Sequence, residues 1–296
     1  MPRPLLALVA LLLLVVSAWS PSGHGHAASL VTSKRFSVPG LAGREQAVAL
    51  WPAAASPDRK LPVVIAFHGR AESALGPVRG YAAWIDRYAL GAAYEALLAP
   101  PLSAAAFGGL VRASDLAALN DALAARPLRG VVVVGVYTPD LLVQPHERRE
   151  RFATWVARTL LPSVHKAVPV ASDAPRAAGV DGVSLGGMVA LEVGLRFPDV
   201  FGSVGTMQPA IRGREGELAA LAERARGAHR QSIRLLSSEA DPLLATTRAF
   251  SEQLRRRHIG HELLVTPGGH DYAFNRGPGA IELLRFHDRA LSPVSR

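Results

Sequence analysis

The stretch Gly182-Val183-Ser184-Leu185-Gly186 limits what this chain can fold into more than any other, because of what lies on either side of it. Residues 176–180 are small or apolar and predict a strand, and residues 188–196 predict a helix. A serine in a tight turn between a strand and a helix needs small neighbours, since the two elements pass closely there. The flanking glycines and Gly187 meet that need, so we interpret Ser184 as a nucleophile. A glycine-rich turn with an incidental serine is the alternative.

Strand-like and helix-like segments alternate along the chain. Residues 61–67 and 129–137 are apolar runs rich in β-branched side chains, which is typical of strands buried within a parallel sheet. The alternation predicts the α/β class, with a mostly parallel central sheet and helices on both faces. Further strands are predicted at 36–38, 46–51, 200–207, 232–236 and 261–266, and further helices at 146–168, 212–226, 244–257 and 281–290.

The segment 76–125 is harder to interpret. It contains helical patches at 81–98 and 114–125, which are interrupted by prolines and glycines. The segment is either an ordinary crossover between strands or a cap over the functional site.

Three candidate catalytic residues each follow a predicted strand. In a parallel sheet the carboxyl ends of the strands share one edge, so Ser184, Asp241 and His270 are expected to meet there. A serine hydroxyl needs a base within hydrogen-bond reach, and the base needs an orienting carboxylate. We assign His270 as the base, because Gly268 and Gly269 let its loop bring the imidazole over the sheet edge. The order serine, aspartate, histidine is that of the α/β-hydrolases.

The assignment of Asp241 as the acid has competitors. Asp241 could instead cap the helix predicted at 244–257, and Glu239 is the second candidate for the acid. We expect Asp271 to point elsewhere, since adjacent residues in an extended loop diverge. Five other histidines are expected to have surface or supporting roles: His165, His229, His258, His261 and His287.

The oxyanion would be held by backbone amides at two strand ends. We assign the N–H groups of Leu185 and Arg70, because both follow directly on the turns at the sheet edge. The His68 side chain is expected to brace its turn rather than to take part in the chemistry. The Arg70 side chain is a hypothetical contact for an anionic part of the substrate.

Composition excludes several classes of protein. With 296 residues, 49% hydrophobic and 19% charged, the chain can form a large core, and we expect residues 29–296 to be one catalytic domain. The net charge of +9 comes from scattered arginines without interleaved aromatics, so no nucleic-acid partner is expected. The chain has no cysteine, which excludes disulfides, thiolate metal sites and a cysteine nucleophile. No cofactor and no metal are expected.

Residues 1–28 have the pattern of a signal peptide. Arg3 precedes the apolar run 5–16, and small residues follow, with candidate cleavage sites near 17–20 and 25–27. The run is short for a membrane span, so the mature chain is expected to have no stable span. An uncleaved anchor is the alternative. We therefore expect a secreted or periplasmic protein.

These motifs together resemble the α/β-hydrolase superfamily. Within it the chain is most similar to the putative-esterase group, which includes esterase D, enterochelin esterases, feruloyl and polyhydroxybutyrate esterases and mycolyltransferases. The resemblance runs from about residue 61 to the end and is carried by 63–69, 182–187 with 197–201, and 241–250 with 267–272. It implies that Ser184, Asp241 and His270 are nucleophile, acid and base. Relatives often have glycine at the position of Ser238 and tryptophan after the histidine, where this chain has Tyr272 and Phe274.

The expected function is that of a secreted serine hydrolase. It would cleave the carboxylic ester of a small molecule or of a polymer-attached group, through the triad and an acyl-enzyme intermediate. An acyltransferase of the same fold, in which an acceptor alcohol replaces water, is one alternative. A non-catalytic relative that binds a ligand is another.

Overall fold

The computed structural model describes residues 29–292. The signal peptide expected at residues 1–28 and its cleavage lie outside the described residues. Among the helices described, none has the length and apolar character needed to cross a bilayer.

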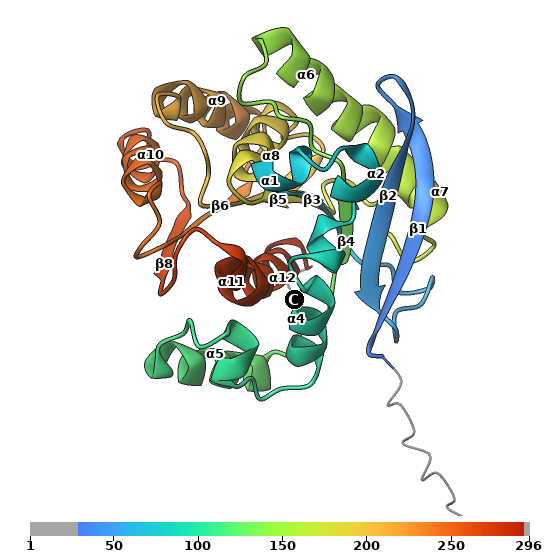
Figure 1. Ribbon diagram of the computed structural model, residues 1–296, viewed down its shortest axis with the longest axis vertical. Helices are drawn as coiled ribbons and strands as arrows, with labels where there is room; N and C mark the ends of the chain where they lie inside the picture. The colour runs from blue at the N-terminus through green and yellow to red at the C-terminus, as the bar shows by residue number, and fades with distance from the viewer. Residues whose placement is uncertain (1–28, 293–296) are drawn as a thin grey trace, which may run out of the picture.

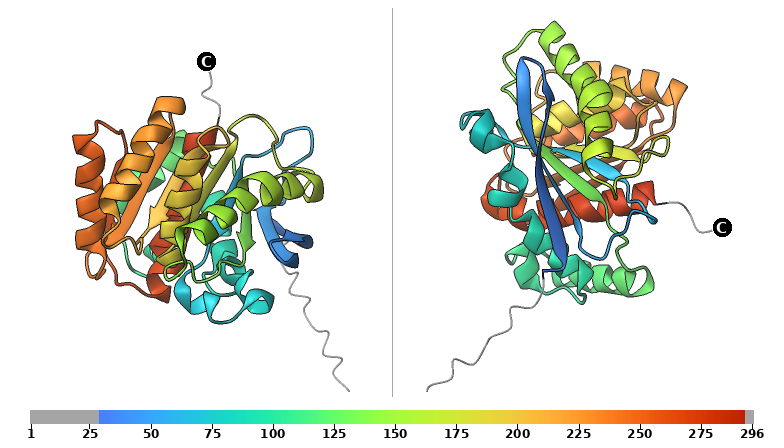
Figure 2. Two further views of the ribbon diagram at one scale, coloured as in Figure 1. Left: turned by 90° about the horizontal axis from the view of Figure 1, so that it is seen from above. Right: turned by 90° about the vertical axis from the view of Figure 1, so that its right-hand side faces the viewer.

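One eight-stranded sheet runs through the molecule, in the order β1-β2-β4-β3-β5-β6-β7-β8. The hairpin β1–β2 and the pair β2–β4 are antiparallel, and the remaining pairs are parallel. Figure 2 shows the hairpin, in blue, at one edge of the sheet. The strands are β1 Val31–Gly40, β2 Gly43–Pro52, β3 Val63–Phe67, β4 Val132–Val136, β5 Ala178–Gly182, β6 Phe201–Met207, β7 Ser232–Ser238 and β8 Glu262–Thr266.

Helices cover both faces of this sheet, as predicted (Figure 1). One face carries α6 His146–Trp155, α7 Leu161–Ala167, α8 Leu185–Arg196, α9 Glu215–Ala228 and α10 Leu244–Arg256. The other carries α4 Leu90–Leu98, α5 Ala113–Ala125 and α12 Ala280–Leu291. The short helices α1 Arg70–Ser73, α2 Pro77–Gly80, α3 Ala83–Asp86 and α11 Tyr272–Phe274 join them, with the turns η1 Ala104–Phe107, η2 Val156–Leu160 and η3 Asn275–Gly279.

The predicted elements are found with shifted boundaries. The first two strands are each ten residues long and extend beyond 36–38 and 46–51. Most of the added residues are polar or are glycine and proline, so they carry little hydrophobic signal. The helix predicted at 146–168 is continuous in α6 and α7, with a π-helical turn at η2 between them. Strand β7 reaches Ser238, two residues past its predicted end.

The sheet centre and α8 pack closely because their residues are branched or small. All five residues of β3 and of β4 are buried, as expected for strands covered on both faces. On α8, a Cβ added to Gly194 would lie 2.5 Å from Val204 Cγ2 of β6. This helix therefore lies against the sheet at a distance that only small residues allow, and its N-terminus is fixed at the carboxyl edge of β5.

The segment 76–125 behaves as a crossover over most of its length. Helix α4 buries Tyr94 and Leu97 in the core on the α12 side of the sheet. Helix α5 is attached more loosely, and only Leu119 and Leu123 of its side chains are buried.

A fully buried polar network lies under the strand that leads to Ser184. Arg234 donates from Nη2 to both oxygens of Asp181, at 3.1 and 2.9 Å, and His287 Nε2 lies 3.0 Å from Asp181 Oδ2. The other His287 nitrogen, Nδ1, lies 2.7 Å from Ser203 Oγ. All four side chains are fully buried. This second serine, histidine and aspartate set cannot meet a substrate, so its role is structural.

The network predicts a large effect on stability. Asp181→Ala leaves the Arg234 guanidinium buried without its carboxylate, so the free energy of unfolding should fall by about 3–5 kcal/mol in urea denaturation. Arg158→Ala, which breaks the exposed pair with Asp199, is the matched control and should change it by about 1 kcal/mol or less. Equal effects of the two substitutions would contradict the account of the buried network.

The network also predicts how stability depends on pH. Burial lowers the pKa of His287, against the opposing effect of Asp181. The His287 ring therefore binds a proton more tightly in the unfolded chain than in the folded one. The stability that neutral His287 contributes is lost as the pH falls below its unfolded pKa of about 6.5. The difference in unfolding free energy between wild type and His287→Gln should shrink from pH 7.5 to pH 5. A constant difference over that range would rule out this role of His287.

Candidate active site

Ser184 sits in a strained turn between β5 and α8. Its backbone has φ 58° and ψ −114°, in the region that side chains other than glycine rarely adopt. The Ser184 N–H donates to Met207 O at 2.9 Å, and the Ala210 N–H donates to Ser184 O at 3.0 Å. A Cβ on Gly186 would lie 2.3 Å from Phe67 O, so glycine is required there, as predicted. The turn has the geometry of a nucleophile elbow.

Asp241 and His270 form a hydrogen-bonded pair. His270 Nδ1 lies 2.9 Å from Asp241 Oδ1, and the Asp241 side chain is 0% exposed. Asp241 also accepts from Ser237 Oγ at 2.6 Å and from the Leu243 N–H at 2.9 Å. Burial alone raises the pKa of Asp241, but the hydrogen bonds from His270, Ser237 and Leu243 outweigh it and hold this pKa below its usual range. The ionised carboxylate keeps the proton on Nδ1, which leaves Nε2 able to accept one.

The rival carboxylates have partners other than His270. Glu239 is exposed and forms an ion pair with Arg112. Asp271 Oδ1 accepts the Phe274 N–H at 2.9 Å and so caps α11, which confirms that Asp271 points elsewhere. The contact of Asp241 with Leu243 shows that Asp241 also orders the start of α10.

The three candidate catalytic residues share one edge of the sheet. Ser184 follows β5, Asp241 follows β7 and His270 follows β8, all at carboxyl ends. Between residues 29 and 292 no hydrogen bond joins Ser184 Oγ to the His270 ring. Catalytic hydrogen bonds are often long in the absence of substrate, so the geometry gives candidates that need a test in solution.

Two backbone amides face the same edge from helix N-termini. Leu185 opens α8 and Arg70 opens α1, so neither N–H has an acceptor within its own helix. His68 braces the turn before Arg70, as expected: Nδ1–H donates to Gly69 O and Nε2 accepts the Thr138 N–H, both at 2.9 Å. Burial lowers the pKa of His68, and the hydrogen bond that Nε2 accepts from Thr138 requires the neutral ring. The Arg70 side chain already has a carboxylate partner, since Nε donates to Asp140 Oδ2 at 2.7 Å.

A buried carboxylate that the sequence did not single out joins the turn after β3 to the histidine loop. Glu72 is 1% exposed and accepts the hydroxyl of Tyr88 at 2.5 Å and that of Tyr272 at 2.6 Å. The Tyr88 oxygen in turn accepts the Gly69 N–H at 3.1 Å. The hydrogen bond to Glu72 raises the pKa of Tyr272, ahead of the effect of burial. The only signal in the sequence was a tyrosine where relatives often have tryptophan.

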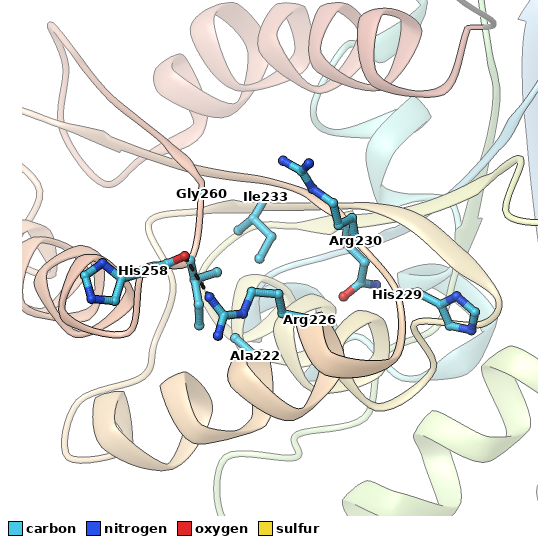
Figure 3. A pocket seen from close by; sticks show the side chains of 9 residues that line it. Ala222, Arg226, His229, Arg230, Ile233, His258 and Gly260 are labelled. Atoms are coloured by element: carbon cyan, nitrogen blue, oxygen red, sulfur yellow. Dashed lines mark hydrogen bonds between the residues drawn. The ribbon is translucent and has the colours of Figure 1, made fainter.

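A cavity of about 260 Å³ lies at the other end of the sheet (Figure 3). Gln231 in its wall precedes β7, whereas Asp241 follows that strand. Figure 3 shows the rings of His229 and His258 pointing away from each other, and Arg226 donates to the His258 carbonyl oxygen at 3.0 Å. These side chains do not converge on a common point, so the cavity does not compete with the edge that carries Ser184.

Comparisons with known proteins agree with this fold. Residues 136–276 match the family described as Putative esterase. No curated protein sequence matches the chain. Among solved structures, the feruloyl esterase module from Clostridium thermocellum has 12% identity, covers 91% of each chain and has a TM-score of 0.63. S-formylglutathione hydrolase from Staphylococcus aureus has 14% identity and a TM-score of 0.56, over 88% of this chain and 97% of that one.

A third similar structure is the enterobactin esterase from Shigella flexneri, with 19% identity and a TM-score of 0.53, over 85% of this chain and 59% of that one. At these identities the structural likeness shows the fold, and the family match is confined to residues 136–276. The sheet order, the strained turn at Ser184 and these similarities lead to one conclusion: the chain has the α/β-hydrolase fold, and its residues 136–276 match the Putative esterase family.

Proposed function

We propose that this esterase is a secreted serine hydrolase that acts through Ser184, His270 and Asp241 and an acyl-enzyme intermediate. The match of residues 136–276 to the Putative esterase family supports the hydrolysis of carboxylic esters. The observation that carries the choice of residues is the Asp241–His270 hydrogen bond, at 2.9 Å, on the sheet edge where Ser184 occupies its strained turn.

The reaction would proceed in two halves. His270 Nε2 takes the hydroxyl proton as Ser184 Oγ attacks the ester carbonyl, and the imidazolium is held by Asp241. The N–H groups of Leu185 and Arg70 stabilise the oxyanion, and one such donor is typically worth about 2.7–4 kcal/mol. His270 then protonates the leaving alcohol, the acyl group stays on Ser184, and a water activated by His270 releases the acid.

The substrate proposed is a small-molecule or polymer-attached carboxylic ester. Support comes from the similar structures, of which one is a feruloyl esterase module complexed with sinapinate and another an S-formylglutathione hydrolase. Secretion is proposed from the apolar run 5–16 behind Arg3, and residues 29–296 are proposed to work as one catalytic domain.

Substitution of the triad tests the proposal against its rival acid. Ser184→Ala should abolish labelling by a fluorophosphonate probe and hydrolysis of p-nitrophenyl acetate. Asp241→Asn should lower kcat by about 10⁴-fold with a folded protein, because the imidazole then takes the wrong tautomer. Glu239→Gln is the matched control and should keep kcat close to wild type, since Glu239 is exposed and paired with Arg112.

Two results would overturn the proposal. One is labelling that persists in Ser184→Ala, which would place the nucleophile elsewhere. The other is a loss of kcat in Glu239→Gln as large as that in Asp241→Asn. The loss in Asp241→Asn would then not identify Asp241 as the specific partner of His270.

A further inference from the structure

We propose that Gln208 is a positioning residue that holds the His270 loop against the turn of Ser184. The inference rests on the proposed triad and deepens it. His270 and Ser184 come from strands separated by β6 and β7, so some group must set the distance between their loops. The described contacts assign that task to the buried amide of Gln208.

The backbone around Gln208 is tied to the nucleophile on both sides. Met207 O accepts the Ser184 N–H, and the Ala210 N–H donates to Ser184 O. The Gln208 N–H itself donates to Leu236 O of the neighbouring β7 at 2.7 Å. Any movement of Gln208 relative to Ser184 would break these bonds, so its side chain starts from a fixed point beside the nucleophile.

The side chain reaches from there to the histidine loop. Gln208 Nε2 donates to Gly269 O at 2.7 Å and to Ser238 Oγ at 2.8 Å, and Ser238 Oγ donates to the same Gly269 O at 3.0 Å. Gly269 directly precedes His270. Because a carbonyl oxygen can only accept, the amide must present its NH₂ group there. One carboxamide thus joins the turn after β6 to the last residue of β7 and to the loop after β8.

The position is unfavourable for stability, which points to a functional reason for keeping it. Gln208 has φ 44°, a left-handed conformation that a side chain other than glycine adopts with strain. The residue is 0% exposed, and its Oε1 has no hydrogen-bond partner among the described residues. An apolar side chain of similar length would fill the same space without burying an unpaired oxygen.

His270 then has two anchors with different tasks. Asp241 holds the ring through Nδ1, and Gln208 holds the backbone through Gly269 O. Without the amide donors the ring would keep its partner, but the loop could move away from Ser184. A misplacement of about 1 Å at a reacting group can lower the rate about 100-fold. The loss should appear in kcat, because Gln208 is buried and has no need to touch the substrate.

Three variants separate the role of the Gln208 amide from that of its backbone, and the first two lack the amide donor. Gln208→Met keeps the length and the strain but has no N–H donor. Gln208→Gly also lacks the donor but removes the strain at φ 44° and so secures a folded protein. Both should lower kcat for p-nitrophenyl acetate on the order of 10- to 100-fold with little change in KM. They should share this loss although their stabilities, measured by thermal unfolding, differ.

Gln208→Glu supplies a signature in pH that a merely structural role would not give. The protonated carboxyl can donate to Gly269 O as the amide does, whereas the carboxylate can only accept and repels that oxygen. Its kcat should therefore be closest to wild type at acidic pH and fall as the pH rises. Wild-type kcat should rise with pH over the same range, as His270 loses its proton.

The results separate this inference from the triad itself. Wild-type kcat in both Gln208→Gly and Gln208→Met, in a protein that fluorophosphonate labels at Ser184, would overturn the role of Gln208 and leave the triad intact. Wild-type kcat in Gln208→Gly alone would also overturn it, since only the backbone would then matter. Activity that persists in Ser184→Ala would instead remove the triad on which the inference rests.

Discussion

The close approach of α8 to the ends of β3 and β5 is the constraint on which the rest of this structure depends. A Cβ on Gly186 would lie 2.3 Å from Phe67 O, and one on Gly182 would lie 2.3 Å from Gly186 O. Because these glycines let the helix begin directly beside β3, the amides of Leu185 and Arg70 face one edge. The same closeness places Ser184 in its strained turn. The site is thus a consequence of backbone packing before any side chain takes part.

Side chains then connect the loops that the sheet brings to this edge. Asp241 links the loop after β7 to the His270 ring, Gln208 links the Ser184 turn to the backbone before His270, and Glu72 links the turn after β3 to Tyr272. Each of these three residues is at most 6% exposed, and each makes more than one hydrogen bond. A buried group with several partners has few alternative positions, so the three links favour one arrangement of the edge.

The sequence predicted what depends on local pattern and missed what depends on pairing. Buried runs such as 63–67 and the glycines around Ser184 have local signatures, and the carboxyl ends of strands are enough to suggest Asp241 and His270. Gln208 and Glu72 have no such signature, since their partners lie far away along the chain. His287 was expected on the surface or in a supporting role. It is fully buried in α12 against Asp181 of β5 and supports the structure there, and its burial had no local signal because histidine and aspartate are more often exposed.

The central claim is that Ser184 carries the acyl group during turnover. The most direct measurement is the intact mass of the protein after mixing with p-nitrophenyl acetate and rapid quenching in acid, followed by peptide mapping. The account predicts one added acetyl group for each chain, on the peptide that contains Ser184, and none in Ser184→Ala. An active protein that shows an acyl group on another residue would contradict it.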